Sequence, residues 1–208
     1  MATKKDSALI IIDVQNDFCP GGSLAVKDGD TVVPVINAIS KDFSLVVATQ
    51  DWHPEGHVSF ASSHTGKTTG DTVSLGKEVQ LLWPDHCVQG SRGADFHPGL
   101  DLRPVRFIVR KGTSLRMDSY SAFFENDKKT STGLEFLLKG LGIRAVYLSG
   151  LATDYCVFYS AMDAVNLGFA TYLLIDGCRG VDIPEGNIDA ALATMRNRGI
   201  AVIRSEDV

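Results

Sequence analysis

The sequence has few cysteines, no long apolar run and no excess of positive charge. Its four cysteines, Cys19, Cys87, Cys156 and Cys178, form no CxxC pair, which argues against a disulfide framework or a zinc knuckle. No apolar run approaches the roughly 20 residues of a membrane span, and the opening MATKKDS lacks a secretory signal. The net charge of −5 argues against nucleic acid as a partner. We therefore expect a protein of the cytoplasm or another reducing compartment, without a membrane or nucleic-acid partner.

Short apolar runs alternate with segments of helical pattern along the chain. The runs predict buried strands at 8–14, 45–49, 105–110, 145–149, 170–175 and 200–204, and the segments predict helices at 31–40, 132–141, 154–167 and 188–198. The runs are continuous rather than alternating, as in parallel strands covered on both faces. Because 44% of the residues are hydrophobic, they can fill one sizeable core. We predict one α/β domain over residues 1–208, with a doubly wound, mostly parallel six-stranded sheet and helices on both faces.

Residues 51–104 interrupt this alternation. The segment is rich in Gly, Ser, Thr and His, holds four of the seven prolines, and is too long for a passive connection. It follows the second expected strand, and ligands in such folds bind beyond the carboxyl ends of the strands. We expect it to be an active-site insertion.

Three expected strands lead into residues with catalytic potential. Asp13 and Lys111 directly follow apolar runs, and the fourth run leads through a turn to Cys156. With Thr153 or Asp154 as N-cap, Cys156 would lie in the first turn of a helix, where the dipole favours a thiolate. Each residue alone has an ordinary explanation: a turn cap, a solvated charge or a buried thiol. In a parallel sheet, however, the carboxyl ends of the strands lie on the same side, so all three residues would lie close together.

Together these groups suggest acyl transfer through a thioester. Asp13 could accept the proton of Cys156 and later pass it to the leaving group. Lys111 would favour the thiolate and keep Asp13 ionised. The free amides around Ala152 and Cys156 could bind the oxygen of a tetrahedral intermediate.

The insertion adds candidate metal ligands. Asp51 and His53 stand on alternate residues, so an extended segment points both side chains the same way, and His86 could be a third ligand. Two imidazoles with one carboxylate suit zinc, iron or manganese. Competing histidines are His57, His64 and His97, of which His57 is nearest in sequence. Ordinary surface loops also contain such histidines.

An ordered set of motifs spans nearly the whole chain. It comprises DVQNDFCPGGSLAV at 13–26, TQDWHP at 49–54, HVSF at 57–60, WPDHCVQG at 83–90, KG at 111–112, YSAF at 120–123 and GLATDYCV at 150–157. The set resembles the nicotinamidases of the isochorismatase-like cysteine hydrolase superfamily. The resemblance implies hydrolysis of nicotinamide to nicotinate and ammonia, a step in NAD salvage.

The same resemblance assigns roles to individual residues. It implies a catalytic triad of Asp13, Lys111 and Cys156. It also implies one divalent metal ion held by Asp51, His53 and His86, for which zinc is preferred over iron or manganese. His57 and Ser59 remain open as a fourth ligand. Phe18 and Trp83 would flank the pyridine ring, with Leu151 and Tyr155 around it, while for Tyr120 ordinary core packing is the preferred interpretation. Relatives have a cis peptide before the alanine that matches Ala152.

Three alternatives remain beside this interpretation. Another amidase of the superfamily, acting on pyrazinamide-type or carbamoyl substrates, would share the triad, and carbamoyl amidases generally lack the metal set. Isochorismatases lack the nucleophilic cysteine and the Asp-x-His pair that Cys156, Asp51 and His53 supply. A metal-binding interaction domain would release no ammonia. We also expect a homo-oligomer.

Overall fold

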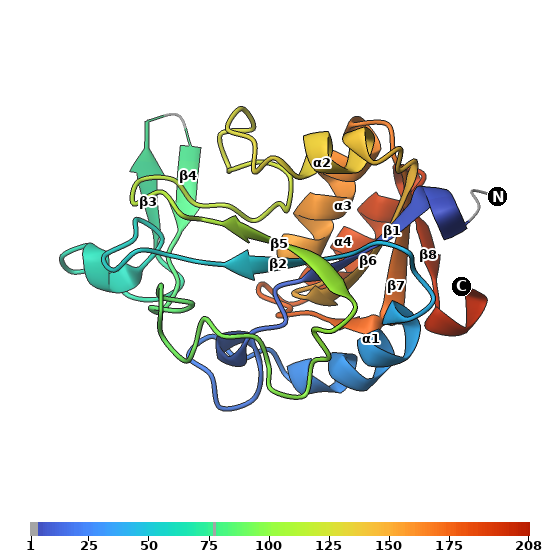
Figure 1. Cartoon of the computed structure of the whole chain (residues 1–208). Coiled ribbons are helices and arrows are strands. Elements are labelled where there is room, and N and C mark those ends of the chain that lie inside the picture. The colour runs from blue at the N-terminus through green and yellow to red at the C-terminus, as the bar shows by residue number, and fades with distance from the viewer. Residues whose placement is uncertain (1–3, 77) are drawn as a thin grey trace.

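The computed structural model, which describes residues 4–76 and 78–208, contains a six-stranded parallel sheet in the order β5-β2-β1-β6-β7-β8 (Figure 1). Its strands are β1 (Ser7–Ile12), β2 (Val46–Asp51), β5 (Val105–Lys111), β6 (Ala145–Leu151), β7 (Ala170–Arg179) and β8 (Ala201–Ile203). The chain extends the sheet from β1 in one direction through β2 and β5, then returns to β6 on the other side of β1. Such a reversal creates a crevice at the carboxyl ends of β1 and β6, where α/β proteins bind ligands. The predicted fold class is confirmed.

Helices cover both faces of the sheet. The helices are α1 (Val32–Ser40), α2 (Leu134–Gly140), α3 (Cys156–Asn166) and α4 (Asn187–Asn197). Alternate residues of β1 face opposite ways: Leu9 and Ile11 pack with Ile36 of α1, while Ile10 and Ile12 belong to the core shared with the other three helices. In Figure 1, α1 lies on one side of the sheet and α3 on the other. This two-sided burial explains the continuous apolar run of β1.

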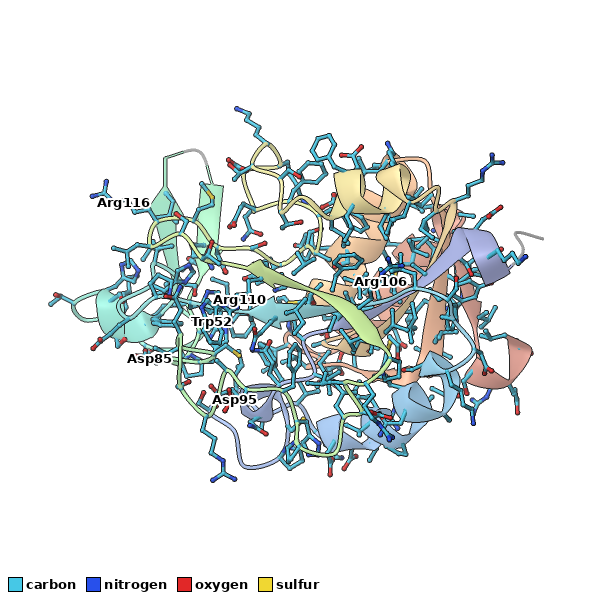
Figure 2. The ribbon with its side chains drawn as sticks, in the orientation of Figure 1. Trp52, Asp85, Asp95, Arg106, Arg110 and Arg116 are labelled. Carbon is cyan, nitrogen blue, oxygen red and sulfur yellow. The ribbon has the colours of Figure 1, made fainter. Side chains whose placement is uncertain are left out.

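The edge strand β5 differs from the prediction. Its residues alternate between partly buried and exposed, and Ile108 is 51% exposed. Arg106 and Arg110 project from the same exposed face, and the Arg110 guanidinium lies 3.9 Å from the centre of the Trp52 ring (Figure 2). The expectation of a strand covered on both faces was therefore wrong for β5. Charged side chains on an edge strand hinder pairing with a second sheet.

The insertion at 51–104 contains a β-hairpin that was not predicted from the sequence. Its antiparallel strands are β3 (Thr72–Leu75) and β4 (Glu78–Leu81), and Figure 1 places them near the end of the molecule toward which β2 points. Five 3-10 helices complete the described elements: Lys4–Asp6, Asn16–Phe18, Gly29–Thr31, Ala61–Ser63 and Ser205–Asp207. No helix in the described part of the chain has the length and apolarity needed to cross a membrane.

Candidate active site

Lys111 is the point at which the three predicted catalytic side chains meet. It is the last residue of β5 and is fully buried. Its Nζ lies 2.9 Å from Asp13 Oδ2, 2.8 Å from Asp51 Oδ1 and 3.5 Å from Cys156 Sγ. It also donates a 2.8 Å hydrogen bond to the carbonyl of Ser119. One ammonium group therefore links two carboxylates and the thiol at the carboxyl edge of the sheet.

Asp13 directly follows β1 and has a left-handed backbone, with φ of 46°. This conformation is uncommon for residues with a side chain, although aspartate tolerates it better than most. The Thr49 hydroxyl on β2 accepts the Asp13 amide at 3.2 Å and donates to Asp13 Oδ1 at 2.6 Å. Thr49 and Lys111 thus hold the buried carboxylate from two neighbouring strands.

The electrostatics differ from the expected helix-activated thiolate. Burial raises the pKa of the Cys156 thiol well above its usual range, and the Lys111 charge offsets only part of the rise. Burial also raises the pKa of Asp13, against the opposing charge of Lys111. For Lys111, burial alone would lower the pKa, but the charges of Asp13 and Asp51 outweigh it and raise the pKa well above its ordinary value. Lys111 therefore stays charged, and the thiol needs a base to lose its proton.

The start of α3 also differs from the prediction. Neither Thr153 nor Asp154 is the N-cap: Tyr155 occupies that position without a side-chain capping bond, and Cys156 is the first helical residue. The backbone amides of Ala152 and Cys156 donate to no acceptor among residues 4–76 and 78–208. The Leu151–Ala152 peptide is cis, as the resemblance implied. Two amide donors therefore remain free beside the thiol.

Asp51, His53 and His86 converge next to Lys111. The Nε2 atoms of His53 and His86 lie 3.2 and 3.7 Å from Asp51 Oδ2. The other ring nitrogens bond to backbone carbonyls, His53 Nδ1 to Gly112 at 2.9 Å and His86 Nδ1 to Pro84 at 2.8 Å. These bonds favour the tautomer whose Nε2 lone pair is free, as in many metal-binding histidines. His53 Nε2 is buried without a hydrogen-bond partner in the described structure, as expected of a nitrogen that binds a metal ion.

His57 is bound differently, although it stacks on His53 with ring centres 4.1 Å apart. Burial lowers its pKa to about 4, so the ring is neutral at physiological pH. Its two nitrogens contact the Ser59 hydroxyl at 2.7 Å and the Met117 carbonyl at 3.1 Å. A second group of possible metal ligands consists of His53, His57 and Asp118. The Asp118 oxygens, however, already accept hydrogen bonds from Gln80 Nε2 and from the backbone amide of Ser119. The first group is therefore the better metal site.

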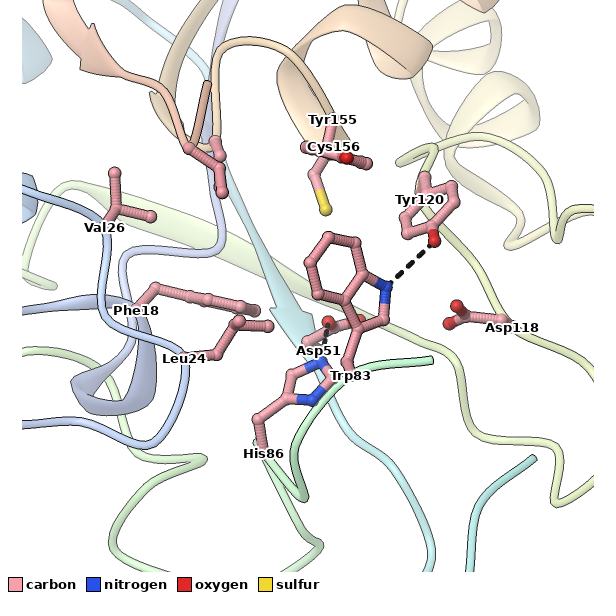
Figure 3. Close-up of a pocket in the computed structure, with 12 residues that line it drawn as sticks. Phe18, Leu24, Val26, Asp51, Trp83, His86, Asp118, Tyr120, Tyr155 and Cys156 are labelled. Carbon is pink, nitrogen blue, oxygen red and sulfur yellow. Dashed lines mark hydrogen bonds and ion pairs between the residues drawn. The ribbon is translucent and has the colours of Figure 1, made fainter. Parts of the chain in front are cut away.

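An apolar cavity adjoins these groups (Figure 3). Phe18, Trp83 and Tyr155, three of the predicted substrate-binding residues, line it together with Cys156. Figure 3 shows the Cys156 sulfur pointing toward the Trp83 ring, with Phe18 to the left of both. Tyr120 also lines the cavity, and its hydroxyl accepts a 3.0 Å hydrogen bond from Trp83 Nε1. The arrangement suits a flat aromatic ring whose substituent faces the thiol.

Leu151 lies elsewhere. It is fully buried, belongs to the core on the α1 side of the sheet, and is not one of the cavity-lining residues. His64 and His97, the remaining candidates for metal ligands, belong to neither metal group; His64 bonds to the Val58 carbonyl, and His97 to the Gly99 amide. The structure therefore separates these residues from the cluster around Lys111.

The family model for the isochorismatase domain matches residues 7–207. The chain belongs to the isochorismatase family. Within this family, a curated nicotinamidase of Acinetobacter baylyi is 47% identical over 208 residues, which cover 100% of this chain and 97% of the relative.

Solved structures of the same family agree in fold. A nicotinamidase/pyrazinamidase of Acinetobacter baumanii superposes with a TM-score of 0.95 at 48% identity, with 98% of both chains covered. The nicotinate complex of PnC1 from L. infantum gives 0.86 at 42%, covering 98% of this chain and 95% of the other. The zinc complex of a Pyrococcus horikoshii pyrazinamidase gives 0.79 at 37%, covering 96% and 99%.

Gln15 is a supporting residue that the sequence reasoning missed in this isochorismatase-family chain. It is fully buried, and its side chain forms two 2.8 Å hydrogen bonds with the backbone of Asp51, accepting from the amide and donating to the carbonyl. The sequence offered no local signal for this contact, which joins residues 36 positions apart. Four further cavity-lining residues were also missed: Leu24 and Val26, which lie in the motif at 13–26 but had no assigned role, and Asp118 and Val181, which lie outside the motifs.

Proposed function

We propose that this chain hydrolyses nicotinamide to nicotinate and ammonia through a thioester on Cys156. It is an amide hydrolase whose full-length nicotinamidase relatives are 41–47% identical. The observation that carries the mechanism is the position of Lys111 Nζ, which contacts Asp13, Asp51 and Cys156 beside an apolar cavity. Base, nucleophile and possible metal ligands are thus within reach of one bound aromatic amide.

Acylation begins with proton transfer from Cys156 to Asp13, since burial keeps the thiol protonated at rest. The thiolate attacks the carboxamide carbon, and the new oxyanion accepts hydrogen bonds from the free amides of Ala152 and Cys156. Asp13 then returns the proton to the amide nitrogen, the C–N bond breaks, and ammonia leaves. Lys111 remains charged throughout, which stabilises the thiolate and favours the ionised carboxylate.

Deacylation uses the same groups in reverse order. Water gives a proton to Asp13 and attacks the thioester carbon, and the amides of Ala152 and Cys156 again hold the oxyanion. The C–S bond breaks, the Cys156 sulfur recovers the proton from Asp13, and the carboxylic acid formed gives its proton to the released ammonia or to solvent and leaves as nicotinate. The enzyme returns to its resting state with no net change in protonation of the site.

Asp51, His53 and His86 fit one divalent metal ion, for which we propose zinc, with iron or manganese as alternatives. The unpartnered Nε2 of His53 and the mixed imidazole and carboxylate donors support the assignment. When bound, the metal would hold the pyridine nitrogen of the substrate. Phe18 and Trp83 would flank the ring, and Tyr155 would close one side. Leu151 would support this pocket from the core rather than contact the ring.

We also propose that residues 1–208 form a single isochorismatase-like domain whose insertion at 51–104 belongs to the active site. The insertion contributes His53, Trp83 and His86 to the cluster described above. Homo-oligomerisation stays a prediction, which light scattering after size-exclusion chromatography would check.

A coupled ammonia assay with nicotinamide tests the function directly. We expect turnover by the wild type and none by Cys156→Ala, with an unchanged circular dichroism spectrum. Cys178→Ala is the matched control, because Cys178 is also a buried free cysteine but lies outside the cavity. A higher catalytic efficiency with carbamoyl compounds than with nicotinamide would refute the substrate. No ammonia from any amide would favour the interaction-domain alternative.

The metal is tested by elemental analysis together with benzamide, which has the carboxamide but no ring nitrogen. Chelation should weaken nicotinamide binding strongly and affect benzamide turnover much less. His53→Ala and His86→Ala should lose bound metal, and the matched variants His64→Ala and His97→Ala should retain it. Because both His57 nitrogens are hydrogen-bonded, His57→Ala should also retain metal. Undiminished nicotinamide turnover by stripped enzyme would remove the orienting role.

A further inference from the structure

Asp154 lies two residues before the nucleophile, but its carboxylate faces a different segment of the chain. It is 4% exposed and does not cap α3. Its Oδ1 accepts the Val181 amide at 2.9 Å, and its Oδ2 accepts the Asp182 amide at 2.9 Å and Asn187 Nδ2 at 3.0 Å. One buried carboxylate therefore binds three donors of residues 181–187, with the added strength of charge-assisted hydrogen bonds.

A second contact joins the same two segments. The Tyr155 hydroxyl donates a 2.7 Å hydrogen bond to the Ile183 carbonyl. The chains also approach closely at Gly180, where a Cβ atom would lie 2.9 Å from Asp154 Oδ1 and 2.5 Å from Ile188 Cγ1. Such spacing admits glycine without displacement of its neighbours. The segment after β7 is therefore held closely against the turn that precedes Cys156.

This attachment bears on the cavity. Val181 and Tyr155 both line it, together with Cys156. Residues 180–186 contain no helix or strand, so regular backbone pairing does not hold Val181 in place. The Val181 amide bonds directly to Asp154, and the Tyr155 hydroxyl to the other part of the same segment. The position of this cavity wall thus depends on a carboxylate that does not itself line the cavity.

We propose that Asp154 is a positioning residue for substrate binding, which holds Val181 and Tyr155 against the bound aromatic ring. It acts on ring affinity and leaves the reacting groups around Lys111 in place, because among the described residues its oxygens bond only to residues 181–187. The inference rests on the proposed function, since its main readout is nicotinamide turnover.

Steady-state kinetics of Asp154→Ala, Asp154→Asn and Val181→Ala test the proposal. We expect Asp154→Ala to raise KM for nicotinamide about tenfold, which corresponds to about 1.4 kcal/mol, and to change kcat less than about threefold. Asp154→Asn keeps one oxygen acceptor and should fall between the wild type and Asp154→Ala. Asp163→Ala is the matched control: it removes another buried carboxylate near Cys156 in sequence, bound to Lys128 away from the cavity, and should keep the wild-type KM.

The double variant Asp154→Ala/Val181→Ala separates action through the cavity wall from general destabilisation. If Asp154 works through Val181, the KM of the double variant should not exceed that of Asp154→Ala, because the wall is already displaced. KM effects that multiply, an Asp154→Ala KM within twofold of wild type, or a loss confined to kcat would each overturn the proposal. If Asp154→Ala does not fold, Asn187→Ala and Asp154→Asn decide by the same KM criterion.

A binding readout separates this inference from the proposed function. Nicotinate should slow alkylation of Cys156 by iodoacetamide, which is small and needs no ring pocket, and Asp154→Ala should require about tenfold more nicotinate for equal protection. Wild type without turnover of nicotinamide would refute the function. Active wild type with equal nicotinate protection in Asp154→Ala would refute only the role of Asp154.

Discussion

Lys111→Met should both destabilise the protein and abolish turnover. The substitution keeps a side chain of similar length but removes the cation that lies 2.9 Å from Asp13 and 2.8 Å from Asp51. Because Lys111 and Asp13 are fully buried, water cannot take its place. Breaking a buried ion pair by removing one partner costs about 3–5 kcal/mol. Since domains of this kind have a total stability of about 5–15 kcal/mol, the loss would be large.

Urea unfolding at neutral pH in the presence of a chelator measures this loss without a metal ion at Asp51 to compensate. Lys111→Met leaves the carboxylates of Asp13 and Asp51 without their cation. The double variant Asp13→Asn/Lys111→Met removes one of these two unpaired charges, so it should regain much of the stability and none of the activity. For Lys111→Met alone, the deficit should shrink as pH falls, because the Asp13 pKa, already raised by burial, rises further without the cation and the carboxyl becomes neutral.

Two results would contradict this reasoning. One is a Lys111→Met protein as stable as the wild type at neutral pH. The other is a double variant no more stable than Lys111→Met, which would mean that the stranded charge of Asp13 is not the source of the cost. Ammonia release by either variant at the wild-type rate would remove Lys111 from the mechanism.

Three further predictions concern single groups. Asp13→Asn should be almost inactive at every pH in the ammonia assay, and wild-type activity would assign the base to another group such as His86. Cys156→Ser should be nearly inactive, because a hydroxyl is harder to deprotonate than a thiol, and an electrophilic pyridine should label only Cys156 in the wild type, as mass spectrometry would show. Glu125 has a buried oxygen without a hydrogen-bond partner in the described structure, and burial raises its pKa from 4.5 to about 7. The folded protein therefore becomes less stable as pH rises through that window. Glu125→Gln should stabilise it by about 1–2 kcal/mol at pH 8, after allowance for solvent screening, and by nothing near pH 4 in urea titrations. Equal gains at both pH values would refute the burial argument.

The regular elements were largely predictable because they depend on local patterns. Each expected strand and helix exists, and most bounds differ by one or two residues, as for the predicted helix at 188–198 and the observed α4, Asn187–Asn197. The errors lie where a neighbour decides the outcome. The exposed face of β5 follows from its position at the sheet edge. The strands β3 and β4 were missed although their sequences, TVSL and EVQL, alternate polar and apolar residues, because each run is only four residues long.

The sequence by itself determined the family. It also determined which polar residues follow the parallel strands, and therefore that Asp13, Lys111 and Cys156 meet, since parallel strands place their carboxyl ends together. Only the tertiary structure decided how those groups behave. Burial of Cys156 raises the pKa of its thiol, whereas its expected position in a helix suggested the opposite, because desolvation depends on everything packed around a group. Asp154 was expected to be an N-cap, but its long-range hydrogen bonds hold residues 181–187 instead. Long-range contacts also place Gln15 against the backbone of Asp51 and Leu151 in the core. Such contacts join residues far apart in the chain, so no local pattern could encode them.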